Sequence, residues 1–438
     1  MEKFRQTLKV RKERAILVGA IQRARNGSDD LAELTALAES AGAIVVDKFQ
    51  QKIRKISTVT YIGKGKAEQL GERVKRFKAD VVIFDNDLSP RQIRELEEIT
   101  KVKVLDRGEL ILDIFATRAK TKQAKLQVEL AQLEYTYPRL TRMWSHLDTV
   151  AGAGGGTAAG AVGGIGTRGP GEQQLEIDRR LVNKRITLLK RELANIDKRR
   201  IREIDGRRGL FKICLIGYTN SGKSTLLNTL TDAGVFVADR LFATLDTRTR
   251  KWTLGRGAEV LLSDTVGFLK SLPHQLIASF KATLEEAINA DLLLHIIDVS
   301  NPDALGQIES VKKVLAEIGC GESPVLLVLN KVDIVRKVSD LEMLQTLCPD
   351  AVCISAKTGL GLEQLSEAVL ARYTGTIVLL RVSSSQSNGK IQSFLRAYGR
   401  IVDEQYSDGC VQIEAALGRN QLPGLKHLGP ENIEIIQG

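Results

Sequence analysis

Apolar and polar positions alternate regularly over the first hundred residues. Four short apolar runs, "AILVGA", "AIVVDKF", "VVIFDND" and "KVKVLDR", predict strands. Three stretches between them, "LAELTALAES", "KAEQLGERVKRFKA" and "SPRQIRELEEIT", have helical spacing. Ser89 suits an N-cap and Pro90 the first helical position. This order predicts a small α/β subdomain with a mainly parallel sheet over residues 1–108.

The pattern then changes to a seven-residue repeat. Residues 109–137 contain no glycine or proline, which predicts one long helix. Its apolar seam is Leu126, Leu130, Leu133 and Tyr137. The same register returns further along at Leu175, Val182, Ile186, Leu189, Leu193 and Ile196. We therefore expect a long antiparallel helical hairpin over residues 109–205.

Basic side chains are expected on the outer faces of this hairpin. They are Arg118, Lys120, Lys122 and Lys125 on the first helix, and Arg179, Arg180, Lys184, Arg185, Lys190 and Arg191 on the second. We interpret them as RNA phosphate contacts, although a solvated coiled-coil face would have the same pattern.

A glycine-rich loop, residues 151–172, lies between the two predicted helices. Ten of its 22 residues are glycine, and Arg168 is its one cation. Glycine lets the backbone approach crowded RNA where a Cβ would clash. Arg168 suits an RNA phosphate or the face of a base. The plainer alternative is a linker that only joins two helices.

A phosphate-binding motif opens the second half of the chain. An apolar strand, residues 212–216, leads into Gly217-Tyr-Thr-Asn-Ser-Gly-Lys-Ser224, and an amphipathic stretch follows. This is GxxxxGK[ST] in the strand–loop–helix order that the motif requires. Backbone N–H groups face the phosphates, Lys223 neutralises the β and γ oxygens, and the Ser224 hydroxyl suits Mg²⁺.

Two further segments complete the phosphate side. "EVLLSDTVGF" predicts a strand that ends in Asp264-Thr-Val-Gly267. Asp264 can hold Mg²⁺ through water, and the Gly267 N–H can meet the γ-phosphate. "LFATLDTRTR", between the two motifs, offers the Thr244 hydroxyl as a second metal ligand. We predict catalytic roles for Lys223, Thr244 and Gly267.

Two more segments predict selectivity for guanine. "SPVLLVLNKVD" is a predicted strand that ends in Asn330-Lys-Val-Asp333, and "VCISAKTG" ends in Ser355-Ala-Lys357. Guanine alone has an N1–H and a 2-amino group for the Asp333 carboxylate, and adenine would leave that carboxylate unpaired. Lys331 can lie over the base, and the Ala356 N–H can meet O6.

Together these segments predict a GTP-binding domain over residues 206–373, with a smaller α/β unit over 374–438. The expected nucleotide contacts are Gly217, Tyr218, Thr219, Asn220, Ser221, Gly222, Lys223, Ser224, Thr225, Phe242, Ala243, Thr244, Leu245, Asp246, Asp264, Thr265, Val266, Gly267, Asn330, Lys331, Val332, Asp333, Ser355, Ala356 and Lys357.

Phe268 occupies the position where many GTPases have a glutamine that orients water. A phenyl ring cannot do this, so we expect slow intrinsic hydrolysis that a partner completes. The alternative is an inactive switch.

Asn220, fourth in the phosphate loop, suits a K⁺ ion beside the phosphates. A hydrogen bond within its own loop would explain Asn220 equally well.

Charge and composition narrow the partners and the compartment. The net charge is +11, and residues 1–210 carry 42 Lys and Arg against 28 Asp and Glu. An excess confined to one half indicates a polyanion-binding module. The sequence has no apolar run of about 20 residues, no secretory signal and no paired cysteines. We expect a cytoplasmic monomer without stable membrane insertion; peripheral membrane association stays open.

The combination of motifs resembles the HflX family of translation GTPases. The matching stretches include "YIGKGKAEQL", "QVELAQLEYTYPRL", "GGIGTRGPGE", "GYTNSGKSTLLNTL", "FATLD" and "DTVGFLKSLPHQL". The resemblance implies a P-loop GTPase domain between an N-terminal α/β subdomain with its hairpin and a small C-terminal domain. It also implies direct Mg²⁺ coordination by Ser224 and Thr244.

For function, the resemblance implies binding of GTP and GDP and of the large (50S) ribosomal subunit with its rRNA. HflX-like proteins split or rescue stalled and idle ribosomes. Two alternatives remain open on the residues themselves. One is a GTPase of ribosome assembly, and the other is an RNA anchor that uses nucleotide only as a switch.

Overall fold

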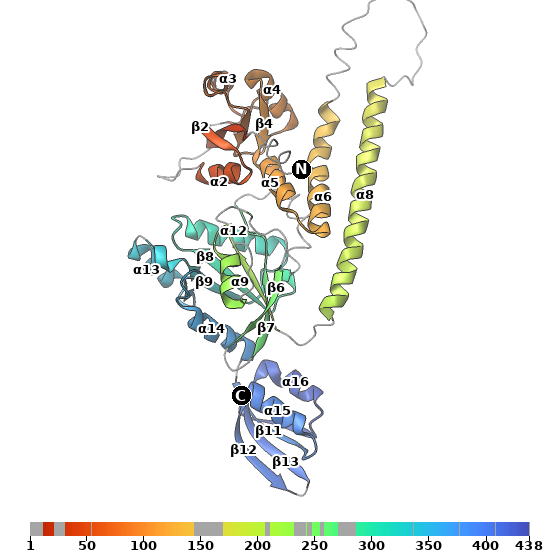
Figure 1. The fold of residues 1–438 in the computed structure, drawn as a ribbon, viewed down its shortest axis with the longest axis vertical. Helices are drawn as coiled ribbons and strands as arrows, with labels where there is room; N and C mark the ends of the chain where they lie inside the picture. Colours follow the sequence, from red (N-terminus) through yellow and green to blue (C-terminus); the bar gives the residue numbers. More distant parts are fainter. Residues whose placement is uncertain are drawn as a thin grey trace, which may run out of the picture. The chain divides into compact units, whose positions relative to one another are not determined.

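The computed structural model describes most of the chain (Figure 1). The described residues are 12–21, 31–53, 55–143, 170–205, 211–231, 242, 248–254, 258–269, 286–335, 337–375, 377–407 and 409–437. The chain divides into two compact units. The first contains residues 1–199 and includes Phe242, and the second contains the GTPase motifs and the C-terminal segment.

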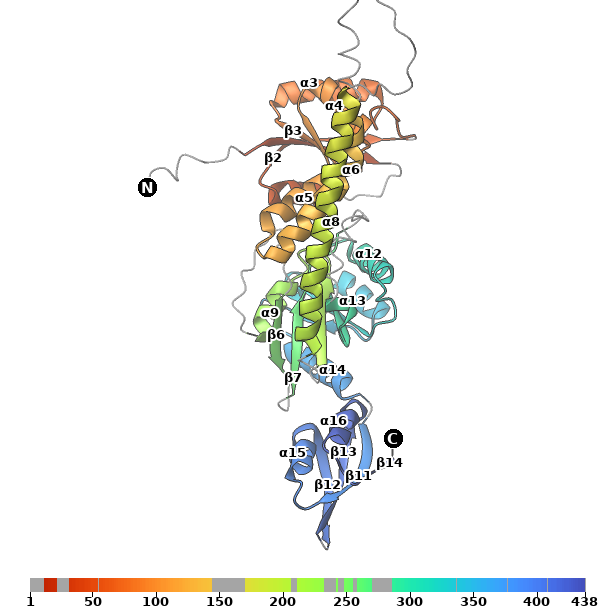
Figure 2. The same cartoon turned by 90° about the vertical axis from the view of Figure 1, so that its right-hand side faces the viewer.

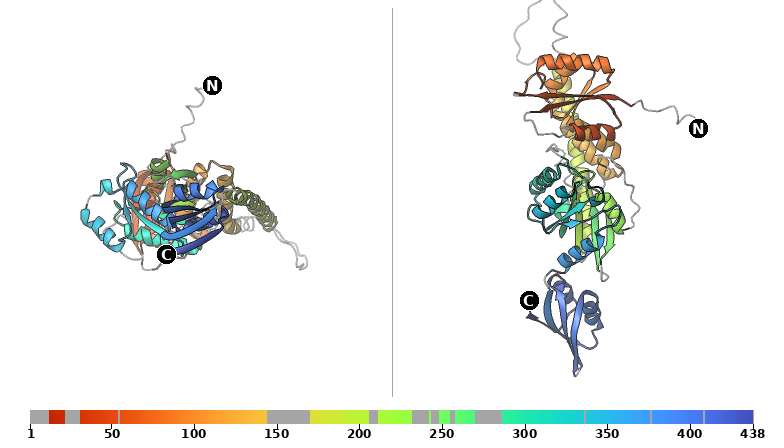
Figure 3. Two further views of the ribbon diagram at one scale, coloured as in Figure 1. Left: turned by 90° about the horizontal axis from the view of Figure 1, so that it is seen from below. Right: turned by 90° about the vertical axis from the view of Figure 1, so that its left-hand side faces the viewer.

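A parallel four-stranded sheet forms the core of the first unit, in the order β2-β1-β3-β4 (Figure 3, right). The strands are β1 (Arg14–Ile21), β2 (Ile44–Lys52), β3 (Val81–Phe84) and β4 (Lys103–Asp106). Helices α2 (Ala32–Ser40), α3 (Lys64–Phe77) and α4 (Pro90–Thr100) connect them. Ser89 caps α4 in a capping box with Gln92. The predicted order of strands and helices is confirmed.

The prediction of one helix starting at residue 109 is wrong. Two helices, α5 (Arg107–Arg118) and α6 (Lys122–Met143), replace it, and a domain boundary after residue 108 would cut α5. Ala119 ends α5 in extended backbone, with φ −60° and ψ 111°. The Thr121 hydroxyl then accepts a hydrogen bond from the Ala124 N–H at 3.1 Å, which starts a new helix.

Helices α6 and α8 (Pro170–Asp205) run side by side (Figures 1 and 2). Their shared apolar cluster contains Leu126, Leu130, Leu133, Ile186, Leu189, Leu193 and Ile196, which confirms this part of the predicted seam. The 36 residues of α8 span about 54 Å at the usual rise of 1.5 Å per residue. The glycine-rich loop lies outside the described residues except 170–172, which begin α8.

Two of the cations predicted on the outer faces point to the neighbouring helix instead. Arg185 pairs with Glu129 at 2.7 Å, and Lys190 pairs with Glu134 at 2.8 Å. Both positions flank the apolar seam, where long charged side chains commonly bridge two helices. Arg179, Arg180, Lys184 and Arg191 of α8 are exposed, as predicted.

The GTPase motifs lie on a six-stranded sheet in the order β10-β9-β8-β5-β7-β6, in which only β6 is antiparallel to its neighbour. The strands are β5 (Phe211–Gly217), β6 (Arg248–Thr253), β7 (Glu259–Asp264), β8 (Leu292–Asp298), β9 (Val325–Asn330) and β10 (Val352–Cys353). The helices include α9 (Lys223–Thr231), α12 (Ala304–Glu317), α13 (Val338–Leu347) and α14 (Leu362–Thr374).

The C-terminal segment forms an antiparallel sheet in the order β12-β13-β11-β14. Its elements are β11 (Ile377–Ser385), α15 (Gly389–Tyr398), β12 (Gly399–Ser407), β13 (Cys410–Gly418), α16 (Leu422–His427) and β14 (Asn432–Gln437). This β-α-β-β-α-β order is the ferredoxin-like arrangement. Both helices pack on one face of the sheet (Figure 2). A small α/β unit was predicted here and is present.

Within the described residues, no helix combines the length and apolar character needed to cross a membrane.

One buried hydrogen bond joins α6 to the N-terminal sheet and gives a first prediction. The Tyr135 hydroxyl donates to Asp106 Oδ1 at 2.5 Å, and Asp106 is fully buried. Tyr135→Phe removes a donor from this carboxylate, so we expect the free energy of unfolding to fall by about 1–3 kcal/mol. Tyr137→Phe is the matched control, because its hydroxyl bonds Asn183 in an exposed contact. Urea unfolding of the full chain measures both, and equal losses would contradict the prediction.

Candidate functional site

The phosphate loop begins where β5 ends, in the centre of the sheet, and two glycines are required there. Gly217 has φ +145°, and an added Cβ would lie 2.3 Å from the Ile296 carbonyl oxygen. Gly222 has φ +97°, and its Cβ would lie 2.2 Å from Asn330 Nδ2. Neither position has the space or the backbone conformation for another residue. The loop therefore passes directly against β8 and the end of β9.

Lys223 is buried at the first position of α9. Its Nζ donates to the carbonyl oxygens of Gly217 at 3.0 Å and Tyr218 at 2.8 Å. Burial lowers the pKa of Lys223 to about 8, and the nearby Asp264 carboxylate opposes that shift. Phosphate oxygens would favour the charged form further. The side chain is thus held in place with its ammonium directed at the loop.

The residue types around Ser224 fit a magnesium ion. Ser224 Oγ donates to Asp264 Oδ2 at 2.6 Å, and Thr265 Oγ1 donates to the Leu215 carbonyl at 2.7 Å, which fixes the end of β7. Mg²⁺ prefers oxygen ligands and commonly takes one or two protein groups plus phosphate oxygens. The described part of the chain has no cluster of three acidic, histidine or cysteine side chains that could hold a metal by itself.

Of residues 232–247, between α9 and β6, the structure describes only Phe242. Its ring is buried edge-on against Phe115 of α5, with centroids 4.5 Å apart, inside the first unit. The predicted nucleotide contact of Phe242 stays a prediction. Ala243, Thr244, Leu245 and Asp246 lie outside the described residues.

Gly267 and Phe268 lie directly against the phosphate loop. The Phe268 N–H donates to Gly217 O at 3.1 Å, and the Thr219 N–H donates to Phe268 O at 2.8 Å. The Phe268 ring is buried, with 2% exposure. The sequence showed that this residue cannot orient water, but not that its backbone pairs with the loop. Since an apolar buried ring stands here, the attacking water needs a polar group from another source.

Asn330 joins the phosphate loop to the two predicted base-binding segments. Its Nδ2 donates to the Ser221 carbonyl at 2.8 Å, and its Oδ1 accepts from the Ala356 N–H at 2.9 Å. The Ala356 N–H was predicted to meet guanine O6, but here it is donated to Asn330 because the carboxamide oxygen faces it. Thr229 of α9 adds a hydrogen bond to the Ala356 carbonyl at 2.8 Å.

The two charged residues of the NKxD segment differ in their surroundings. Lys331 has a left-handed backbone, φ +68°, and a side chain that is only partly exposed. Asp333 lies in the short 3₁₀ helix η2 (Val332–Ile334), and its side chain is exposed. In the second loop Ser355 is buried and Lys357 is exposed. The structure therefore brings the phosphate and base segments together at the carboxyl ends of parallel strands, where α/β sheets bind ligands.

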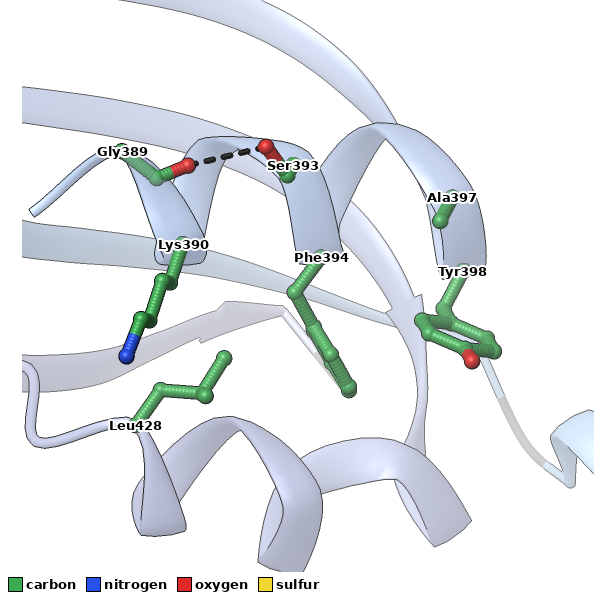
Figure 4. A pocket seen from close by; sticks show the side chains of 7 residues that line it. All are labelled: Gly389, Lys390, Ser393, Phe394, Ala397, Tyr398 and Leu428. Carbon is green, nitrogen blue, oxygen red and sulfur yellow. Dashed lines mark hydrogen bonds between the residues drawn. The ribbon is translucent and has the colours of Figure 1, made fainter.

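A shallow cavity that the sequence did not indicate lies on the C-terminal domain (Figure 4). Phe394, Tyr398 and Leu428 line it, with the Lys390 ammonium near its edge. The two rings are 4.6 Å apart between centroids. The seven residues that line it include no carboxylate, histidine or cysteine side chain.

Three family models match consecutive parts of the chain. They are described as "GTP-binding GTPase N-terminal" over residues 28–116, "GTP-binding GTPase Middle Region" over 118–207, and "50S ribosome-binding GTPase" over 212–331.

Curated relatives match over most of their length. The chain is 42% identical to the GTPase HflX of Lacrimispora saccharolytica over 423 residues, which is 93% of this chain and 94% of the relative. It is 40% identical to the GTPase HflX of Escherichia coli over 412 residues, which is 92% of this chain and 93% of the relative. Among solved structures, a GTP-binding protein of Sulfolobus solfataricus in complex with GDP is 25% identical, with a TM-score of 0.43. The match covers 82% of this chain and 98% of the Sulfolobus chain.

His295 gives a prediction about pH. It lies on the central strand β8 with 2% exposure, and burial lowers its pKa to about 3. The unfolded chain, with an ordinary histidine pKa of about 6.5, binds a proton that the folded chain rejects, so stability falls as pH drops below about 6.5. His295→Leu should reduce the loss of stability between pH 7 and pH 5 by about 2 kcal/mol.

Trp252 is buried in the same domain and reports its unfolding in a Trp144→Phe background. Urea titrations at the two pH values measure the difference. The exposed His427, changed to Leu, is the control for replacing a histidine by leucine outside this domain. Parallel pH curves for His295→Leu and the unmodified chain would contradict the prediction.

Proposed function

The chain belongs to the HflX family of GTPases, and from this premise we propose that it splits stalled or idle ribosomes by acting on the large subunit. The chain is a GTPase, and its GTPase domain is of the 50S ribosome-binding type. One observation supports partner-stimulated hydrolysis most directly: a nearly complete nucleotide site has a buried phenyl ring, Phe268, where a water-orienting glutamine would be.

The binding roles follow from the contacts already described. Lys223 would neutralise the β and γ oxygens, and backbone N–H groups of the loop from Gly217 to Thr225 would surround the phosphates. Ser224 and Thr244 would be direct ligands of Mg²⁺, and Asp264 would hold the ion through water. When bound, the metal neutralises charge that develops on the transferred phosphoryl group. Gly267 would donate its N–H to the γ-phosphate.

The base would lie between the NKxD and SAK segments. Asp333 is exposed, so its carboxylate is accessible to the N1–H and 2-amino group of guanine. Lys331 would cover the base plane. Because Ala356 donates its N–H to Asn330, a contact with O6 would share that hydrogen or come from the adjacent Lys357 N–H.

The RNA contact would come from the helical hairpin. Four exposed cations of α8, namely Arg179, Arg180, Lys184 and Arg191, suit phosphate oxygens. Arg185 and Lys190 would contribute less, because each is paired with a glutamate of α6. Arg168 and the glycine-rich loop would enter an RNA-walled cavity of the ribosome. A role in ribosome assembly would use the same contacts without separating subunits.

Splitting by the full chain is the first test of this proposal. We expect slow basal GTP turnover, a strong rise with purified large subunits, and release of small subunits from intact ribosomes. Arg168→Ala, or a neutral glycine–serine loop in place of residues 151–168, should leave GTP binding unchanged and impair splitting. Light scattering for splitting and phosphate release for turnover provide the measurements. Fast turnover that ribosomes do not alter, or no release of small subunits, would refute the proposal. Normal splitting by both variants would refute the role of Arg168 and the loop.

A monovalent cation is the second test. Asn220 has a left-handed backbone, φ +60°, which asparagine tolerates better than most residues. We expect GTP turnover to be faster in K⁺ than in Na⁺, because K⁺ would add positive charge beside the transferred phosphate. Asn220→Ala should abolish the difference. Equal turnover in both salts would leave only the alternative, that Asn220 serves its own loop.

A further inference from the structure

Lys331 forms an ion pair with a carboxylate that belongs to none of the GTPase motifs. Its Nζ lies 2.6 Å from Oδ2 of Asp298, the last residue of β8. Asp298 is the register partner of Asn330 in the β8–β9 pair, so it stands one residue away from Lys331 across the ladder. The Asp298 side chain is 15% exposed and the Lys331 side chain is 23% exposed. The pair therefore lies at the edge of the base-binding segment.

The Asp298 carboxylate is itself fixed in position. Its Oδ1 accepts hydrogen bonds from the Ser300 N–H at 3.0 Å and the Ser300 hydroxyl at 2.5 Å. The Val299 N–H donates to the Asn330 carbonyl at 3.1 Å, which ties this turn to the end of β9. One oxygen is occupied by the turn, and the other faces Lys331. The ammonium thus has an anchor that does not move independently of the NKxD segment.

The chemistry of lysine explains why such an anchor matters. A lysine side chain is flexible along four carbons and loses rotamer freedom when it is ordered on a ligand. A side chain that is already held in its bound conformation reduces this cost of binding. We propose that Asp298 is a positioning residue for guanine nucleotides: it holds the Lys331 ammonium so that the aliphatic stem lies extended over the base.

Two consequences separate this role from a structural one. A partly exposed ion pair contributes little to the stability of the fold, so its loss should change nucleotide binding more than unfolding. The lysine stem also covers any purine, whereas Asp333 would recognise guanine through the 2-amino group. Loss of Asp298 should therefore weaken guanine and hypoxanthine nucleotides equally.

Stopped-flow dissociation of methylanthraniloyl-GDP and methylanthraniloyl-IDP from the full chain tests the proposal. Asp298→Asn keeps an oxygen for Ser300 but removes the charge. We expect both nucleotides to dissociate about 5- to 20-fold faster. Dissociation is the step to measure, because most mutations that weaken binding act on the dissociation rate. Asp298→Glu restores the charge and should recover part of the effect. Unchanged dissociation in Asp298→Asn would overturn the proposal.

A double-mutant cycle identifies the route of the effect. In a Lys331→Ala background, Asp298→Asn should cause no further acceleration, because the partner is gone. Ser300→Ala removes the hydroxyl donor and leaves the ion pair, so dissociation should stay within about twofold of the unmodified chain. If Asp298→Asn accelerates dissociation equally with and without Lys331, or if Ser300→Ala alone reproduces it, Asp298 acts through the turn and the proposal is overturned.

Discussion

The nucleotide site depends on one buried carboxamide. Asn330 donates to the phosphate loop at Ser221 and accepts from the Ala356 N–H, so a single side chain connects three segments that are far apart in sequence. It also limits the loop beside it, because any Cβ at Gly222 would overlap its Nδ2. Removing the carboxamide would leave buried polar groups of both loops without their partner, at a cost larger than the hydrogen bonds themselves contribute.

Asn220 and Lys331, on the segments that the Asn330 side chain connects, both have left-handed backbone. Such conformations cost roughly 1–2 kcal/mol for a residue with a Cβ and persist where surrounding contacts determine them. Asn330 precedes Lys331 directly, and its side chain and carbonyl are both hydrogen-bonded. The ion pair with Asp298 holds the far end of the Lys331 side chain. The strained backbone and the fixed side chain therefore belong to one rigid base-binding segment.

Local patterns were enough to predict the four N-terminal strands, the Ser89 cap, the apolar seam of α6 and α8, and the grouping of the GTPase motifs. Features that depend on distant contacts were not predictable. The break before Lys122 needs the Thr121 cap, and most of the preceding helix from Arg107 to Phe115 is buried in the N-terminal unit. Arg185 and Lys190 point to glutamates 56 residues away in each case. The donation of the Ala356 N–H to Asn330 also follows from packing, which no motif spacing reveals.

The bond from Asn330 to Ser221 spans 109 residues of sequence, and this separation bears on how the domain folds. Closing so large a loop costs conformational entropy, so this bond is one of the contacts between distant residues that slow folding. GDP or GTP that binds the completed site, and not the unfolded chain, would then shift the folding equilibrium by mass action. Bound nucleotide would thereby raise the fraction of the chain that is folded at equilibrium.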